Sequence, residues 1–283
     1  MKSPAIVDSH VHLWDPSQNR YPWLAGVPAL DRAFLPADFS AVTAAARVEK
    51  MIFVESGCDP AQSLAEVKWV STLAGREPRL KGIVAHAPLE RGRGVLAELQ
   101  VLAAMPLVKG VRRLLQGETA VDFCLRPNFL AGVKLLEKFN FTFDLCIRPE
   151  QLAGVTELVR RVPPVTFILD HLGKPDVRGG HAGPWSKSLQ TLAALPNVVC
   201  KISGLTTEAD HSRWQPGDLK FYLERALEVF GIDRILFGSD WPVATLATSY
   251  QRWVETVQNA FLSVGEAGLV KIFQTNAERI YRV

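Results

Sequence analysis

Cysteine is scarce in this chain of 283 residues. The four cysteines are widely spaced, and no two of them form a CxxC pair; they are Cys58, Cys124, Cys146 and Cys200. This spacing argues against a zinc finger and against the disulfide framework of a small secreted domain. We therefore expect a reducing, cytoplasmic setting.

An excess of charge of one sign is also absent. Lys and Arg number 32 against 29 Asp and Glu, which leaves a net charge of +3. A surplus this small, without a long basic run, argues against nucleic acid as a partner. Hydrophobic residues make up 48% and charged residues 22%, a composition that excludes a disordered or collagen-like chain.

Long apolar stretches and nucleotide-binding glycine motifs are lacking as well. No segment has the ~18 uninterrupted apolar residues of a membrane span, and polar residues interrupt the N-terminal sequence after Val7. We therefore expect neither a signal peptide nor a membrane partner. No GxGxxG or GxxxxGK[ST] follows the first apolar run, so a nucleotide site has no support.

What the sequence does contain is a recurring pattern of short apolar runs. Eight of them are rich in β-forming residues: Ala5–Val7, Met51–Val54, Gly82–Ala85, Leu107–Val111, Phe141–Ile147, Val165–Leu169, Asn197–Ile202 and Arg234–Phe237. Helical periodicity marks the segments Pro60–Leu73, Pro127–Phe139, Gln151–Arg161, Pro184–Ala194, Asp218–Phe230 and Ser249–Leu262. Strands that are apolar throughout are typical of a parallel sheet covered on both faces.

Eight such units predict an α/β protein with a (β/α)₈ TIM-like barrel as a single domain over residues 1–283. A doubly wound sheet is the alternative, and the length alone would also fit two domains of ~150 residues. The segment Asp15–Pro36 is too long for a simple connector, so we expect a functional loop there.

Polar residues follow several of the predicted strands, where a barrel carries its active site. His10 and His12 come directly after the first strand, and side chains at i and i+2 of an extended segment point the same way. Two imidazoles facing one point suit a divalent cation, although structural histidines are the alternative. His171 ends the sixth run and Asp240 the eighth, whereas we expect a loop or capping role for Asp170.

These residues lie in motifs that resemble the amidohydrolase superfamily. DSHVHLWDP, LDHLGKP, VVCKISGL, FGSDWPV and NAERIY are most similar to its sugar-lactonase branch, the L-fuconolactonase and L-rhamnonolactonase type, and the match runs from about Asp8 to Tyr281. The resemblance implies a distorted, metal-dependent type of (β/α)₈ barrel and a hydrolase that opens a lactone with water. By position, His10, His12, His171 and Asp240 match the family's metal or carbonyl-polarising cluster, and Asp240 its catalytic aspartate.

The metal requirement stays open at this stage. Two-metal members of the superfamily use a Lys or Glu on strand four and a His on strand five, and no histidine is available near strand five here. One divalent ion is therefore expected, with zinc ahead of manganese. The alternative is a metal-independent lactonase in which the histidines donate hydrogen bonds directly.

The remaining candidates concern catalysis and substrate binding. We expect Asp240 to act as the general base, with His171 in the catalytic cluster. Arg112, Gln116 and Asp144 are candidates for substrate oxygens, although Asp144 could equally be a buried carboxylate paired with an arginine. Flat rings can cover the apolar face of a sugar, which makes Trp23 and Trp241 the aromatic candidates. The roles of Glu55, His86, His211 and Lys201 stay open, although a buried Lys201 would need a carboxylate partner.

The preferred substrate is a small-molecule sugar lactone, an aldono-1,4- or 1,5-lactone. The alternative is a decarboxylase, hydratase or dicarboxylate lactonase of aromatic-acid degradation, which would need several arginines in its pocket where the sequence offers only Arg112. A binding protein that has lost activity would lack the catalytic carboxylate, but Asp240 is present. The sequence does not identify the lactone or the oligomeric state, a homo-oligomer included.

Overall fold

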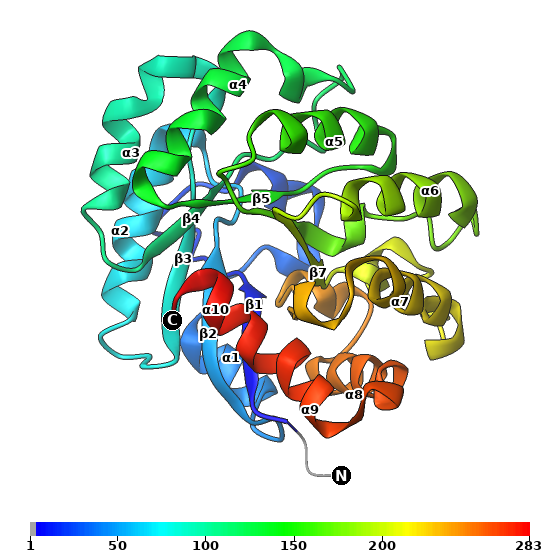
Figure 1. Cartoon of the computed structure of the whole chain (residues 1–283). Helices are drawn as coiled ribbons and strands as arrows, with labels where there is room; N and C mark the ends of the chain where they lie inside the picture. The colour runs from blue at the N-terminus through cyan, green and yellow to red at the C-terminus, as the bar shows by residue number, and fades with distance from the viewer. Residues whose placement is uncertain (1–3) are drawn as a thin grey trace.

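The structure, a computed structural model, describes residues 4–283 and contains one parallel sheet whose eight strands follow one another in chain order. The strands are β1 (Ile6–Val11), β2 (Val48–Val54), β3 (Leu80–His86), β4 (Val108–Arg112), β5 (Thr142–Leu145), β6 (Phe167–Leu169), β7 (Val198–Ile202) and β8 (Ile235–Phe237). Each overlaps one of the eight predicted runs. The sheet curls into a nearly closed TIM-like barrel, which confirms the predicted fold (Figure 1).

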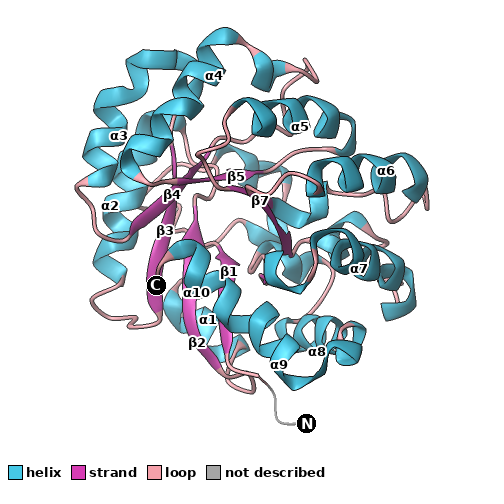
Figure 2. Cartoon of the chain, viewed as in Figure 1, coloured by secondary structure: helices cyan, strands magenta, loops and turns pink. Residues whose placement is uncertain are grey.

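Helices surround the barrel, as Figure 2 shows. They are α1 (Pro36–Val42), α2 (Ser63–Leu73), α3 (Leu96–Ala103), α4 (Pro127–Lys134), α5 (Leu152–Arg161), α6 (Ala182–Ala193), α7 (Pro216–Phe230), α8 (Tyr250–Ala260), α9 (Gly265–Val270) and α10 (Asn276–Tyr281). The six predicted helices are present, although the one expected to reach Phe139 continues after α4 as a 3₁₀ turn. The four helices that were not predicted have at most eight residues, which is too short for helical periodicity to stand out.

The two ends of the sheet meet just beyond the last strand. Asp240 donates its backbone N–H to the carbonyl oxygen of His10 at 2.9 Å, and His12 donates to the carbonyl of Trp241 at 2.7 Å. The Ser9 hydroxyl donates to the carbonyl of Phe237 at 2.6 Å. This junction places the HxH segment beside Asp240, although the two lie near opposite ends of the chain.

Apolar side chains fill part of the inside of the barrel, and α10 closes it at one end. Inward-pointing residues of the strands, among them Val7, Val54 and Leu236, pack against Ile280 and Tyr281 of this helix. Figure 1 shows α10 lying across the ends of β1 and β2. The opposite end, at the C-terminal ends of the strands, is therefore the one that can admit a ligand. No helix within residues 4–283 has the length and apolar character needed to cross a bilayer.

Candidate active site

A cavity of about 390 Å³ lies at the C-terminal ends of the strands. The residues that line it come from the first loop and from the ends of seven different strands: His12, Trp23, Ser56, Gly57, Arg112, Leu114, Gln116, Cys146, His171, Lys174, Thr207, Asp240 and Val243. An active site assembled from many strand ends is typical of this fold. The cavity is therefore the candidate active site.

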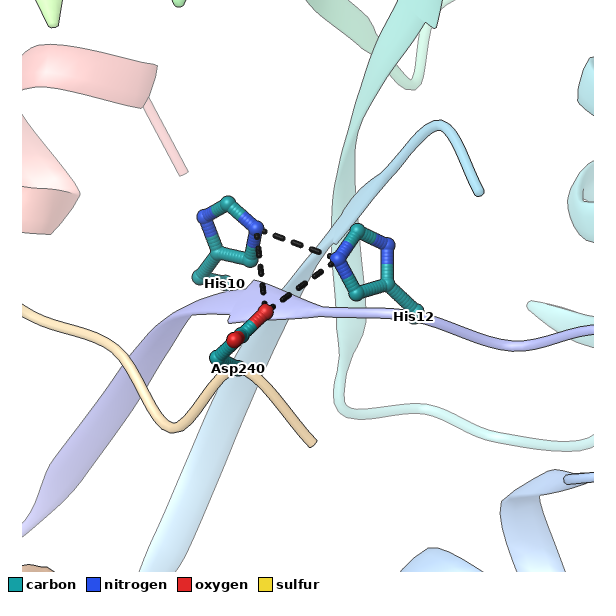
Figure 3. Close-up of side chains that lie close together, drawn as sticks. All are labelled: His10, His12 and Asp240. Atoms are coloured by element: carbon teal, nitrogen blue, oxygen red, sulfur yellow. Dashed lines mark hydrogen bonds and ion pairs between the residues drawn. The ribbon is translucent and has the colours of Figure 1, made fainter. Parts of the chain in front are cut away.

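His10, His12 and Asp240 form a tight group (Figure 3), of which His12 and Asp240 line the cavity. The two histidines project from β1 and its extension, and their Nε2 atoms are 3.2 Å apart. Asp240 Oδ1 lies 3.6 Å from Nε2 of His10 and 3.4 Å from Nε2 of His12. The i, i+2 spacing thus directs both imidazoles to one point, and the barrel junction adds the carboxylate.

The third histidine approaches from the end of β6. The His171 ring centroid is 4.6 Å from that of His10, and its Nδ1 is 2.9 Å from the Ser203 hydroxyl. The backbones of His171, Lys174 and Asp240 have φ angles of 54°, 52° and 60°. This left-handed conformation costs a residue other than glycine about 1–2 kcal/mol and persists where surrounding contacts hold it, often at functional sites.

Burial and neighbouring groups set the charges of the group at neutral pH. Burial lowers the pKa of His171 to about 4, so that its imidazole is neutral at pH 7. Burial alone would raise the pKa of Asp240, but His171, His12 and His10 outweigh it and hold this pKa well below its usual range. Asp240 is therefore an ionised carboxylate beside the neutral imidazole of His171, in a position to accept a proton.

A network of buried ion pairs lies next to the histidines of the site. Arg112 donates through Nε to Glu55 Oε1 at 2.7 Å and lies 3.3 Å from Asp170 Oδ2. Lys201 donates to Asp144 Oδ2 at 2.7 Å and lies 3.0 Å from Asp170 Oδ1. All five side chains are buried. The loop or capping role expected for Asp170 is therefore wrong, because its carboxylate joins the two buried cations.

The His10, His12 and Asp240 group meets the requirements of a cation site. Ligand atoms at the usual distances from a tetrahedral zinc ion lie about 3.3–3.5 Å apart, close to the three separations measured here. His12 Nδ1 is 2.9 Å from the carbonyl oxygen of Val54, which leaves its Nε2 lone pair for a cation. Two nitrogen donors and a carboxylate oxygen are a set that Zn²⁺ and Mn²⁺ both accept.

Three of the five predicted substrate-binding residues line the cavity, namely Arg112, Gln116 and Trp23. Trp23 is held there by a hydrogen bond from its Nε1 to the carbonyl of Ser56 at 2.8 Å. Arg112 reaches the cavity, but Glu55 and Asp170 already occupy much of its guanidinium. Few of its N–H donors therefore remain for a substrate.

The other two do not reach the cavity. Trp241 is 2% exposed and packs edge-on against Phe34 and Phe39, with ring centroids 5.6 and 5.2 Å away. Asp144 is fully buried and accepts hydrogen bonds from Lys201 and Tyr281. The expectation that these two side chains contact substrate is thus corrected: Trp241 belongs to the core, and Asp144 is the buried carboxylate of the alternative, paired with a lysine instead of an arginine.

Of the residues whose roles were open, two become part of the buried network and two stay outside the site. Lys201 has the carboxylate partners that its burial requires, and Glu55 pairs with Arg112. His86 ends β3 beside Arg112 without lining the cavity. His211 is exposed, and its Nε2 lies 3.0 Å from the carbonyl of Thr207.

Lys174, Thr207 and Cys146 also line the cavity, although they were not among the candidates predicted from the sequence. Burial works against the charge of Lys174, but nearby Cys146, Glu208 and Asp240 raise its pKa, so that it carries a charge at pH 7. Its nearest carboxylate, Glu208 Oε1, is 3.6 Å away, and this leaves N–H donors for a ligand. Lys174 belongs to the LDHLGKP motif, but the turn that directs its side chain into the cavity cannot be predicted from the sequence.

Gly204 provides a test of how closely the site is packed. Its φ is +57°, and a Cβ at this position would lie 2.4 Å from His171 Nδ1 and 3.1 Å from Asp240 Oδ2. We expect Gly204→Ala to displace His171 and lower kcat at least about tenfold, because misplaced catalytic groups lose rate steeply. The control is Gly231→Ala: φ is +71° but nothing lies within 4 Å of the new Cβ, so only stability should fall, by about 1–2 kcal/mol. Equal kcat values for the two variants would contradict this packing.

Glu66 of α2 gives a prediction for pH. Its carboxylate is buried behind the cavity near the backbone N–H of Ser56, and burial together with the charge of Glu55 raises its pKa from 4.5 to about 8. Between these values the unfolded chain has lost the proton that the folded chain keeps, so the free energy of unfolding falls as pH rises from about 5 to 8. We expect Glu66→Gln to reduce this fall in urea unfolding. If the free energy of unfolding changed with pH in the same way in both proteins, the raised pKa of Glu66 would be contradicted.

Comparison with known proteins agrees with this geometry. A family model described as Amidohydrolase matches residues 7–283. An L-fucono-1,5-lactonase of Burkholderia multivorans is 34% identical over 281 residues, covering 88% of each protein. An L-rhamnono-gamma-lactonase of Scheffersomyces stipitis is 24% identical over 234 residues, covering 72% of this chain and 69% of that protein. A crystal structure of an amidohydrolase from B. multivorans with bound zinc has a TM-score of 0.89 at 31% identity and covers 99% of both chains. The predicted resemblance is confirmed, and the chain belongs to the amidohydrolase family.

Proposed function

We propose that this protein hydrolyses a sugar-derived lactone to the corresponding aldonic acid. The observation that carries the proposal is the ionised carboxylate of Asp240 beside three buried histidines at the base of a cavity. Its relatives named as lactonases support the same reaction class. L-fucono-1,5-lactone is the first substrate to try, and L-rhamnono-1,4-lactone the second.

In this proposal Asp240 acts as the general base. Its carboxylate accepts the proton of a water molecule that attacks the lactone carbonyl, and the same carboxyl group then returns the proton to the ring oxygen as the ring opens. His171 and Lys174 line the same cavity and are placed to donate hydrogen bonds to substrate oxygens. One positioned base of this kind contributes about 10²–10⁴-fold in rate.

His10, His12 and Asp240 are the residues that would hold a divalent ion. Such an ion, zinc ahead of manganese, supplies Lewis-acid polarisation of the carbonyl and lowers the pKa of a bound water. The surrounding charges favour a cation, because the four buried carboxylates of Glu55, Asp144, Asp170 and Asp240 outnumber the positive charges of Arg112, Lys201 and Lys174. The zinc bound to the B. multivorans amidohydrolase supports this ion for the present protein.

The lining of the cavity favours a hydroxylated, uncharged substrate over a dicarboxylate. Gln116, Thr207 and Lys174 offer hydrogen-bonding groups, and Trp23 offers a flat apolar face. Its two basic side chains are Arg112 and Lys174, and Arg112 is already paired with two carboxylates. A substrate with two or more negative charges would be poorly neutralised here.

A panel of aldono-1,4- and 1,5-lactones, followed with a pH indicator, tests the proposal. We expect acid release well above the spontaneous rate for at least one member, with the same ring size and stereochemistry preferred in every preparation. Addition of a chelator, followed by Zn²⁺ or Mn²⁺, measures the metal requirement in the same assay. Absence of turnover across the panel would contradict a sugar lactonase.

Lys174→Met probes substrate recognition. Loss of a hydrogen bond from a charged group costs about 1.5–3 kcal/mol, so we expect kcat/KM for the best lactone to fall about 10- to 150-fold. Lys187→Met on α6 is the control, because Lys187 is exposed and remote from the cavity lining. Equal losses in the two variants would show that Lys174 has no special role.

A further inference from the structure

Glu66 is a buried carboxyl group that the proposed reaction does not use, and its contacts connect it to one wall of the cavity. We propose that Glu66, in its uncharged form, is a positioning residue that holds Trp23 in the cavity wall, and that its ionisation displaces Trp23 and weakens substrate binding. The substrate part of this inference rests on the proposed function. The position of Trp23 can be measured without a substrate.

Ser56, just beyond the end of β2, connects Glu66 to Trp23. Both carboxyl oxygens of Glu66 lie near the backbone nitrogen of Ser56, Oε1 at 3.3 Å and Oε2 at 3.4 Å. The carbonyl oxygen of the same residue accepts the hydrogen bond of Trp23 Nε1 at 2.8 Å. A movement of Ser56 therefore shifts the atom that holds the indole ring.

The indole ring of Trp23 also packs against its neighbours in the wall. A Cβ at Gly57 would lie 3.4 Å from both Cδ1 and Nε1 of Trp23, and the ring of Trp14 meets the indole edge-on with centroids 5.3 Å apart. Trp23, Ser56 and Gly57 all line the cavity. This wall thus includes the segment that Glu66 contacts.

The long loop between β1 and α1, which carries Trp23, meets the start of α2 close to Glu66. Arg20 donates its backbone N–H to Gln62 Oε1 at 2.6 Å. The side chains on either side of Arg20, Asn19 and Tyr21, are only 3% and 5% exposed. Glu66 raises and Asn19 lowers the pKa of the Tyr21 hydroxyl, because both side chains are close to it. Glu66 is completely buried at this junction, so a change in its charge acts on the loop.

The groups around the Glu66 carboxyl favour its uncharged form at pH 7. Burial and the nearby carboxylate of Glu55 raise its pKa to about 8. The Ser56 N–H, the Tyr21 hydroxyl and Arg112 act in the opposite direction, as does the position of Glu66 in the first turn of α2. The first two effects prevail, so the carboxyl group keeps its proton at neutral pH.

Ionisation of Glu66 disturbs this arrangement. Burial raises the pKa of both Tyr21 and Cys58, so neither side chain becomes charged near pH 8. The new negative charge therefore adds to that of Glu55 in a buried place, which is unfavourable. We expect water to enter between the loop and α2 to hydrate the charge, and the loop that carries Trp23 to move with it.

The first measurement follows the Nε1–H resonance of Trp23 in the full-length protein labelled with ¹⁵N-tryptophan. Trp23→Phe assigns this resonance among those of the seven tryptophans. In the wild-type protein we expect it to move as pH rises, with a midpoint near 8. Glu66→Gln keeps an uncharged group with a carbonyl acceptor for Ser56, so its Trp23 resonance should stay at the neutral-pH position. A wild-type resonance that ignores pH, or the same response in Glu66→Gln, would overturn the proposal.

Kinetics on the best lactone separate substrate binding from chemistry. Glu66→Leu removes the acceptor for Ser56, so we expect KM to rise at least about fivefold while kcat changes less than about twofold. Glu66→Gln should keep the wild-type KM at pH 7 and lose the rise in KM that the wild-type protein shows above about pH 8. A change confined to kcat would overturn the proposal.

A double variant tests whether Glu66 acts through Trp23. In the Trp23→Phe background, Glu66→Leu should add little to KM, because a residue that acts only through the indole has nothing left to position. Thr256→Val removes a buried hydrogen bond on α8 and is the control for lost stability, with KM unchanged. Multiplied effects in the double variant would overturn the proposal.

The two kinds of measurement also keep the proposals apart. If Glu66→Leu fails to fold, the pH series of the wild-type protein and Glu66→Gln still decides. If no lactone is turned over, the proposed function fails, and the Trp23 resonance still tests the role of Glu66.

Discussion

Replacement of Asp240 by asparagine is expected to lower kcat on the best lactone by about 10²–10⁴-fold. The amide keeps the size of the side chain but cannot accept the proton of the attacking water. Steady-state rates with the two proteins, corrected for spontaneous opening, measure the effect. KM should change less than kcat, because the other groups that line the cavity remain.

The fold should tolerate this change. Asp240 has a φ of 60°, and asparagine adopts this left-handed conformation more readily than most residues. The backbone N–H of residue 240 can still donate to the carbonyl of His10. The control is Asp233→Asn, an exposed aspartate paired with Lys271, which should retain full activity. An Asp240→Asn protein with near wild-type turnover would show that another group is the base.

The largest effect on stability is expected for Arg112→Met. Methionine fills a similar volume but leaves Glu55 and Asp170 buried without the guanidinium that pairs with both. Burial alone would raise the pKa of Glu55, whereas Arg112 and His86 keep it below its usual value, which shows the direction of this stabilisation. Removing one partner of a buried ion pair costs about 3–5 kcal/mol, and we expect a loss of this size in the free energy of unfolding at pH 7.

The loss is measured by urea unfolding of Arg112→Met, and Arg91→Met serves as a control in which an exposed ion pair is removed. Arg91 forms an exposed ion pair with Glu98, and its removal should cost less than about 1 kcal/mol. The difference in free energy of unfolding between the two variants should become smaller at low pH, because protonation neutralises the unpaired carboxylates of Glu55 and Asp170. Similar losses in both variants at pH 7 would mean that the buried network contributes little.

The parts of this account that the sequence could predict depend on local patterns. Apolar runs identified every strand, because the strands are buried on both faces of the sheet over most of their length. The i, i+2 spacing of His10 and His12 predicted two imidazoles on one side, and their position after the first strand placed them at the barrel mouth. Asp240 joined them only through the resemblance and its position at a strand end.

What could not be predicted depends on side-chain direction after a strand has ended. Trp241 follows Asp240 directly, yet it turns into the core while the carboxylate faces the cavity. Asp170 and His171 are also adjacent, and only the second lines the cavity. Lys174 enters through a run of left-handed residues whose conformation no propensity indicates. Ion pairs such as that of Lys201 with Asp144 join strands far apart in sequence, so no local spacing reveals them.

The most direct test of the central claim compares kcat/KM of the wild-type protein for L-fucono-1,5-lactone and for a dicarboxylate lactone derived from aromatic-acid degradation. In the cavity, Lys174 is the positively charged side chain that still has N–H donors for a ligand. Gln116 and Thr207 add hydrogen-bonding groups, and Trp23 adds a flat apolar face. We therefore predict a preference of at least about a hundredfold for the sugar lactone, a difference of about 2.7 kcal/mol in the transition state. Preference for the dicarboxylate, or no acceleration of sugar-lactone opening, would contradict the account.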